Sequence, residues 1–161
     1  MPLNVGDRLP ETTFYVIGES GPEARTTAEL FAGRRVVLVG VPGAFTPGCH
    51  RTHLPGFIEH RDAILDKGVD LIAVVAVNDP YVMRAWKEAS GATGDILFLS
   101  DGNAEFARAA GLDMDASARG QGTRLRRFVM IVNDGTVEVL NTETIAGQIS
   151  ATAAARVLEM L

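Results

Sequence analysis

The order of its segments predicts that this chain is an α/β protein, a three-layer α/β/α sandwich with a central mixed sheet. Continuous β-branched and aliphatic runs at 35–41 and 69–77 are typical of strands covered on both faces. Segments with helical periodicity follow both runs, and the chain closes with a hairpin and a last helix. At 161 residues the chain is long enough to bury a real core, and we expect one domain over 1–161.

The N-terminal part is expected to contribute a strand and a short helix. Residues 12–17 alternate in the manner of an early strand or hairpin arm. Thr26 and Glu29 have the spacing of a capping box, which predicts a short helical turn that ends at Gly33.

Two helices are expected after the two apolar runs. Apolar residues at helical spacing predict a helix over 47–66, and Pro55 should kink its first turns because proline has no N–H to donate. Asn78-Asp79-Pro80 is typical of a cap followed by a first-turn proline, so it should open the next helix. The shared face of that helix is expected to consist of Val82, Ala85, Trp86 and Ala89.

The C-terminal part is expected to hold a hairpin between shorter elements. Residues 128–132 and 137–140 should pair, because the intervening Asn-Asp-Gly-Thr sequence strongly favours a tight turn. The other expected elements are a strand at 96–99, a helix at 103–110 stopped by Gly111, an irregular segment at 112–124 and a last helix from near Ser150.

The only cysteine, Cys49, lies where a predicted buried strand ends and a helix begins. Thr46 followed by Pro47 suits an N-cap and a first helical position, which puts Cys49 in the first turn. The unpaired N–H groups and the positive end of the helix dipole favour an anion there, so the thiol is expected to be thiolate-prone and nucleophilic. The alternative is an inert core cysteine, the commoner fate of a free thiol.

The pattern Pro42-x-x-x-Thr46-x-x-Cys49 resembles the active-site signature of the peroxiredoxins, thiol peroxidases with a thioredoxin-like fold. Residues 40–49, followed by 52–57, are similar to the atypical, type II (peroxiredoxin V-like) subfamily. Matches at 77–79, Trp86 and 126–128 extend the resemblance over nearly the whole chain. It implies a thioredoxin-like fold and peroxide reduction.

Peroxide reduction requires a thiolate and donors for the departing oxygen. Cys49 would supply the sulfur, and the amides of Gly48 and Cys49 could donate to the peroxide oxygens. Thr46 could hold sulfur and substrate in line, and Pro42 would shape the pocket and limit water. As a plain N-cap, Thr46 would also satisfy the pattern.

An arginine beside the sulfur would stabilise the thiolate without losing its own charge. In the family, an arginine at the start of a late strand has this role, and Arg127 matches it. Arg126 is the rival, because successive strand residues face opposite sides and the sequence does not show which side is inward. Trp86 also matches the family, although core packing is the better interpretation.

His50, His53 and His60 all lie near Cys49, which raises the question of a metal site. No second cysteine or clear ligand quartet accompanies them, so we expect neither a metal nor another cofactor. His53 is expected to pack or hydrogen-bond beside the active loop.

Charge and composition exclude several other classes. A net charge of −5 and a sequence pI of about 5.2 argue against nucleic-acid binding, although Arg119, Arg124, Arg126 and Arg127 form one basic cluster. No apolar run is long enough to span a bilayer, and no secretory signal is visible. One cysteine excludes an internal disulfide and suits a reducing compartment, so a cytoplasmic location is expected.

The leading functional hypothesis is a thiol-dependent peroxidase acting on hydrogen peroxide and organic hydroperoxides. The alternatives are a monothiol disulfide-exchange protein and a redox-inert binding module on a thioredoxin-like scaffold. The reaction would leave Cys49 as sulfenic acid. Many members of the subfamily resolve the sulfenic acid of the corresponding cysteine with a second cysteine of the same chain, which this chain lacks. We therefore expect recycling by an external thiol, either glutathione with glutaredoxin or a thioredoxin, and the family implies a homodimer.

Overall fold

A computed structural model describes residues 2–92, 96–143 and 148–161. Its centre is a seven-stranded sheet in which β3, β4 and β5 run parallel while β1, β2, β8 and β9 pair antiparallel, so the predicted mixed sheet is confirmed. In sheet order the strands are β2 (Gly21–Thr26), β1 (Thr13–Gly18), β5 (Ile96–Ser100), β4 (Leu71–Ala76), β3 (Arg35–Gly40), β8 (Phe128–Asn133) and β9 (Thr136–Thr142).

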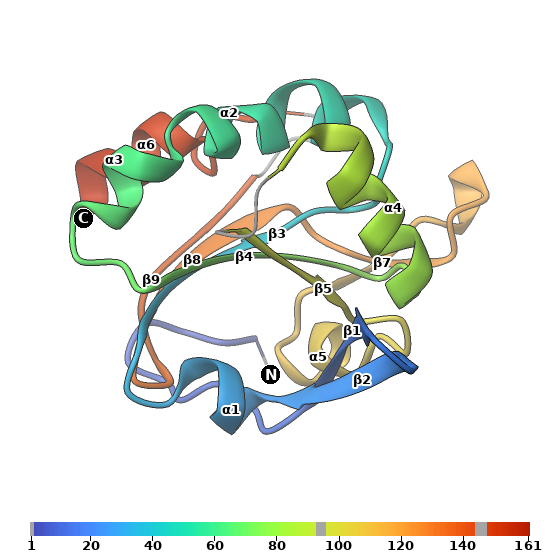
Figure 1. Ribbon diagram of the computed structural model, residues 1–161, viewed down its shortest axis with the longest axis horizontal. Coiled ribbons are helices and arrows are strands. Elements are labelled where there is room, and N and C mark those ends of the chain that lie inside the picture. Colours follow the sequence, from blue (N-terminus) through green and yellow to red (C-terminus); the bar gives the residue numbers. More distant parts are fainter. Residues whose placement is uncertain (1, 93–95, 144–147) are drawn as a thin grey trace.

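Helices cover both faces of this sheet, as the three-layer prediction requires (Figure 1). One face is covered by α2 (Leu54–Glu59), α3 (Arg61–Leu65), α4 (Pro80–Ser90) and α6 (Ala154–Met160). The other face is covered by α1 (Thr27–Phe31) and α5 (Glu105–Ala109). No helix in the described part of the chain is long and apolar enough to cross a membrane.

The central strands send alternate side chains into two separate cores. On β3, Val37 and Val39 pack under α2 and α4, whereas Val36 and Leu38 pack on the side of α1 and α5. Because both faces of β3 are covered, its sequence is one continuous apolar run with no alternation of polar residues. We call these the helix-rich face and the opposite face.

The predicted helix over 47–66 exists but is divided into three pieces. Helical structure starts at Pro47, widens into the π-helix η1 (Cys49–His53), and continues as α2 and α3 on either side of a break at His60. The Leu54 N–H donates to the Cys49 carbonyl, one residue beyond the α-helical spacing. Since Pro55 has no N–H, the wide turn in front of it is the form that the expected kink takes.

Two local predictions were incomplete or wrong. Strand β2 was missed because it is a mostly exposed edge strand with Pro22 and charged residues, which hide the period-2 pattern. The segment 112–124, expected to be irregular, contains a second small sheet of β6 (Asp113–Asp115) and β7 (Thr123–Leu125), with the 3₁₀ helix η2 (Ser117–Arg119) between them. These strands have three residues each, too few for a recognisable period.

Two helices differ in detail from the predictions. On α4 the fully buried residues are Met83 and Trp86, whereas Ala85 and Ala89 are exposed, because the large side chains gain more from burial. The last helix starts at Ala154 rather than near Ser150. Ser150 donates two hydrogen bonds to Glu143 instead of capping a helix.

The hairpin between β8 and β9 is confirmed, with positive φ at Asp134 and Gly135 as a tight turn requires.

Candidate active site

The loop in front of Cys49 starts where β3 ends and is held by two other elements. The Ala44 N–H donates to Asn78 Oδ1 at 2.9 Å, and Asn78 follows the neighbouring parallel strand β4. From the other side, Arg124 of β7 donates to the Pro42 carbonyl at 3.5 Å. The shape of the loop therefore depends on contacts with distant parts of the chain as well as on its own prolines and glycines.

Cys49 and Arg127 meet inside the protein. The cysteine side chain is fully buried, and Arg127 Nη2 donates to its sulfur at 3.3 Å. Arg127 is itself only 8% exposed, which limits screening of its charge by water. The rival Arg126 is exposed on the opposite face, where it lines a hollow with Leu112 and Leu140. Of these two arginines, Arg127 is the one placed to stabilise a thiolate.

His53 accepts the second hydrogen bond from the Arg127 guanidinium, at 2.8 Å from Arg127 Nη1 to His53 Nδ1. Arginine can only donate, so Nδ1 must be unprotonated and Nε2 must carry the hydrogen. Nε2 then donates to the Thr152 carbonyl at 2.9 Å. Burial, assisted by the charge of Arg127 and opposed by the Thr152 hydrogen bond, lowers the pKa of His53 to about 4. The ring is therefore neutral at pH 7.

The remaining predicted site residues, Pro42, Thr46 and Gly48, lie on the loop and helix start that lead to Cys49, and all are half-buried. The Thr46 carbonyl accepts the first helical hydrogen bond, from the His50 N–H at 2.8 Å, so the helix begins where expected. The Thr46 hydroxyl instead donates to the Gly43 carbonyl at 2.6 Å, which orients it by the loop rather than by a helix amide. The amides of Gly48 and Cys49 precede that first helical bond and so lack an intrahelical acceptor.

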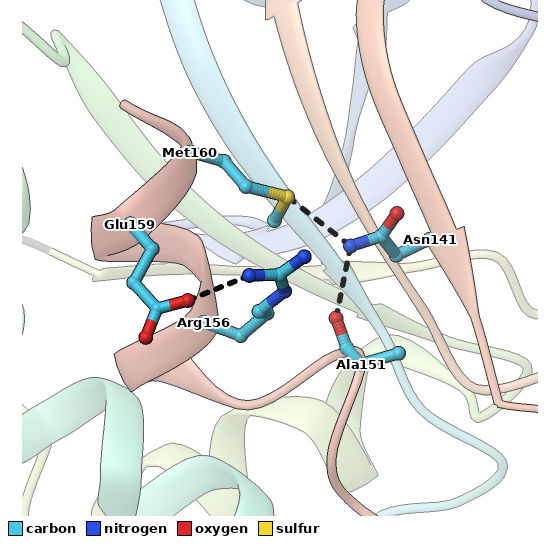
Figure 2. A network of polar contacts seen from close by, with 5 residues as sticks. All are labelled: Asn141, Ala151, Arg156, Glu159 and Met160. Atoms are coloured by element: carbon cyan, nitrogen blue, oxygen red, sulfur yellow. Dashed lines mark hydrogen bonds and ion pairs between the residues drawn. The ribbon is translucent and has the colours of Figure 1, made fainter.

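The C-terminal segment 148–153, which precedes α6, carries the Thr152 carbonyl that accepts from His53. The Glu143 carboxylate accepts hydrogen bonds from the N–H and hydroxyl groups of both Ser150 and Thr152. Figure 2 shows a second attachment, in which Asn141 donates to the Ala151 carbonyl at 3.0 Å and to the Met160 sulfur at 3.2 Å. The segment that carries the hydrogen-bond acceptor for His53 is thus held at two points.

The other two histidines and Trp86 have separate partners. Trp86 is fully buried, as the packing interpretation expects, and its indole N–H also donates to His50 Nδ1 at 3.0 Å. His60 Nδ1 lies 2.9 Å from the Gly56 carbonyl one helical turn earlier. Among the described residues, no group of three or more His, Cys, Asp or Glu side chains is arranged to hold a metal ion.

Sequence reasoning missed three contributors to this site: Asn78, Glu143 and Thr152. Asn78 entered the prediction only as part of the Asn78-Asp79-Pro80 helix start, which is confirmed, because Asp79 caps α4 by accepting from the Val82 N–H at 3.0 Å. The position of Asn78 after a strand parallel to β3 was the available indication, because loops at the carboxyl ends of adjacent parallel strands meet. Glu143 and Thr152 had no such indication, since their contacts depend on a long-range arrangement.

Comparisons with known proteins show the family to which the chain belongs. A model of the Redoxin family matches residues 4–157. The chain is 49% identical to Peroxiredoxin-2E-2, chloroplastic, of Oryza sativa subsp. japonica, over 99% of this chain and 72% of that protein. It is 40% identical to Peroxiredoxin-2E, chloroplastic, of Arabidopsis thaliana, over 88% of this chain and 62% of that protein. The crystal structure of reduced Prx3 from Vibrio vulnificus in complex with H2O2 has a TM-score of 0.93 at 44% identity, with 98% of both chains covered.

The predicted cytoplasmic location is contradicted by these relatives, two of which are named chloroplastic and point to a plastid. The composition of a folded domain does not reveal its compartment, because the signals that direct a protein to an organelle are separate segments. The predicted fold and family are confirmed. With a thioredoxin-like fold, one buried cysteine and these relatives, the chain belongs to the peroxiredoxins as a type II-like, one-cysteine member, and is a thiol-dependent peroxidase.

Proposed function

We propose that Cys49 is the peroxidatic nucleophile and that Arg127, Thr46, Pro42 and Gly48 form its reaction site. The observation that carries the proposal is the 3.3 Å contact between Arg127 Nη2 and the buried sulfur of the single cysteine. A fixed cation beside a thiol at a helix start favours the thiolate. The whole chain, residues 1–161, would act as one catalytic domain.

In the proposed reaction the thiolate attacks one oxygen of a hydroperoxide ROOH and the O–O bond breaks. Cys49 becomes sulfenic acid, and the departing RO⁻ takes a proton from solvent to leave as water or an alcohol. The negative charge that develops on the departing oxygen would be met by the Gly48 and Cys49 amides and by Arg127. Thr46 would align the peroxide through its hydroxyl oxygen, which its bond to Gly43 orients.

Peroxide consumption by purified protein, with Cys49→Ser as its matched variant, tests this assignment. Rapid consumption that disappears in Cys49→Ser is the expected result. Consumption that survives the substitution would contradict it. Thiol transfer to a disulfide substrate in the absence of peroxide would instead favour the monothiol-exchange alternative.

Regeneration of Cys49 would need two external thiols. The first attacks the sulfenic acid, releases water and forms a mixed disulfide with Cys49, and the second attacks that disulfide and releases the Cys49 thiolate. The presence of only one cysteine supports this scheme, because no internal disulfide can form. Glutathione with glutaredoxin, or a thioredoxin, supplies thiols of the required kind.

Mass spectrometry after peroxide treatment would follow this cycle. Without added thiol, excess peroxide should convert Cys49 to sulfinic acid. With glutathione, a mixed disulfide at Cys49 should replace the sulfinic product. Sustained turnover in the absence of any added thiol would refute the scheme.

The proposed assembly is a homodimer formed through the face that carries the active loop. Phe45 supports it, since this aromatic side chain is 47% exposed on that loop and its backbone has a φ of 64°, outside the range common for such residues. Sedimentation analysis should give a dimer for the native chain and a larger monomer fraction for Phe45→Ser. A monomeric native chain at all concentrations would exclude this assembly.

A further inference from the structure

A continuous set of hydrogen bonds connects Glu143, on the segment after β9, to the sulfur of Cys49. Thr152 Oγ1 and N–H donate to Glu143 Oε2 at 2.6 and 2.8 Å. The Thr152 carbonyl accepts from His53, His53 accepts from Arg127, and Arg127 donates to the sulfur. Glu143 does not touch the sulfur, so any effect that it has on the thiol passes through this set.

Each bond in this set has only one possible direction. Because Arg127 can only donate, His53 must present an unprotonated Nδ1 to it and a protonated Nε2 to its other neighbour. That neighbour is the Thr152 carbonyl, at 2.9 Å in a site where His53 is 1% exposed. If the Thr152 carbonyl were displaced, the buried Nε2–H of His53 would have no acceptor, which is unfavourable. The ring could then rotate or change tautomer to relieve this unfavourable state. Either change would remove the acceptor that orients Arg127.

Glu143 holds this carbonyl in place by collecting four donors. Besides the two from Thr152, the Ser150 N–H and hydroxyl donate to the carboxylate at 3.0 and 3.2 Å. Burial by itself would raise the pKa of Glu143, but the hydrogen bonds from Thr152 and Ser150 together outweigh it and lower the pKa. Oε2 accepts three of the four bonds and Oε1 accepts the fourth, so a glutamine, whose amide nitrogen cannot accept, loses at least one bond and the negative charge that strengthens the others.

We propose that Glu143 is a positioning residue, which fixes the Thr152 carbonyl so that His53 keeps the tautomer that holds Arg127 against Cys49. The inference rests on the proposed role of Cys49 and Arg127. Glu143 has a second link to the same arginine, because its backbone N–H donates to the Arg127 carbonyl at 3.2 Å.

The direction in which a Glu143 substitution changes the reactivity of Cys49 distinguishes a positioning role from a direct effect of the Glu143 charge. Arg127 and His53 are the ionisable groups of the described chain that lie between Glu143 and the sulfur. Loss of the negative charge of Glu143 would, through space alone, make the surroundings of Cys49 more positive and favour the thiolate. Loss of positioning would release Arg127 and disfavour the thiolate. The two mechanisms therefore move the reactivity of the thiol in opposite directions.

The test substitutes Glu143→Gln, with Glu138→Gln as its control. Glu138 lies on β9, is similarly a carboxylate, and pairs only with Arg35 at the protein surface among the ion pairs of the described residues. Alkylation of Cys49 by iodoacetamide, followed against pH, should have its midpoint raised by about one pH unit in Glu143→Gln. Peroxide reduction should slow by about tenfold, as a small displacement of a catalytic group can cause. Glu138→Gln should leave both unchanged.

Nitrogen-15 NMR of the His53 ring gives a readout that general destabilisation would not move. In the native chain His53 should be a single Nε2–H tautomer, and in folded Glu143→Gln it should be a mixture. An unchanged tautomer, or an alkylation midpoint that stays in place or falls, would overturn the proposal. If Glu143→Gln does not fold, Thr152→Val removes one of the four bonds while keeping the carbonyl, and should move both readouts in the same direction.

These readouts also separate this inference from the proposed function. Alkylation and NMR do not require peroxide turnover. A native protein without peroxidase activity but with the expected shifts would contradict only the proposed function. Full activity with no shifts would contradict only the positioning role of Glu143.

Discussion

Arg126 and Arg127 are neighbours in sequence, yet they lie in opposite environments. Arg127 is buried on the helix-rich face with its guanidinium against Cys49 and His53, whereas Arg126 is exposed beside Leu112 and Leu140 on the opposite face. Both precede β8, and the strand alternation places them on different sides. The two residues are chemically identical and adjacent in sequence. The difference shows that the role of an arginine here depends on the side of the sheet that its side chain faces and on how deeply it is buried.

The largest expected effect comes from exchanging these two arginines for alanine in turn. Arg127→Ala should slow peroxide reduction on the order of a hundredfold or more, because a preorganised donor and charge are lost at the sulfur. Arg126→Ala should have little effect. Stopped-flow measurement of peroxide reduction compares the two, and equal effects or the reverse order would show that the wrong arginine was assigned.

Substitution of Gly40 tests whether the packing of the opposite face contributes to the stability of the protein. Gly40 pairs with Phe128 across β3 and β8, and a Cβ at this position would overlap the buried Phe128 ring. Gly40→Ala should therefore reduce the free energy of unfolding by about 2 kcal/mol, as overpacking of a core does. Urea denaturation measures this loss.

Gly56→Ala is the matched control for Gly40→Ala. A Cβ at Gly56 would meet the Ala154 Cβ at an ordinary 3.8 Å, and alanine is the better helix former. Its free energy of unfolding should be unchanged or higher. A Gly40→Ala protein as stable as Gly56→Ala would refute the tight packing of the opposite face.

The pH dependence of stability should reveal His53, because it is the buried titratable partner of Arg127. The pKa of His53 is about 4 in the folded protein, against 6.5 for an ordinary histidine, so below pH 6.5 the unfolded chain binds a proton that the folded chain does not. Stability should consequently fall as the pH drops from 6.5 toward 4, by about 1 kcal/mol between pH 7 and 5.5. His53→Gln, which cannot titrate, should lack this component. Parallel pH curves of unfolding free energy for both proteins would contradict it.

The smallest effect is expected from Gly48, where the helix start passes close to Arg127. A Cβ at Gly48 would lie 3.1 Å from Arg127 Nη2, so the guanidinium must move by a few tenths of an ångström. Gly48→Ala should slow peroxide reduction by about threefold to tenfold at nearly unchanged stability. In an Arg127→Ala background it should have no further effect, since the two changes act through one contact. Additive losses would show that Gly48 acts independently of Arg127.

Much of the fold followed from local patterns in the sequence. The apolar runs predicted the parallel strands β3 and β4, and the Asp134-Gly135 turn predicted the β8–β9 hairpin. Thr46 and Pro47 predicted a helix start that puts Cys49 in its first turn, where the structure has it. These features depend on residues close together in the chain, so their physical causes are visible in short stretches of sequence.

The sequence by itself determined that this protein has one thiol, at a strand-to-helix junction, and no internal disulfide. Only the tertiary structure decided which arginine meets that thiol. Because β8 is buried on both faces, its sequence is a continuous apolar run and does not show which residues face the helix-rich side. The same holds for the link from Glu143 through Thr152 to His53, which joins residues about a hundred positions apart. Such contacts depend on how the layers pack, and no local propensity encodes them.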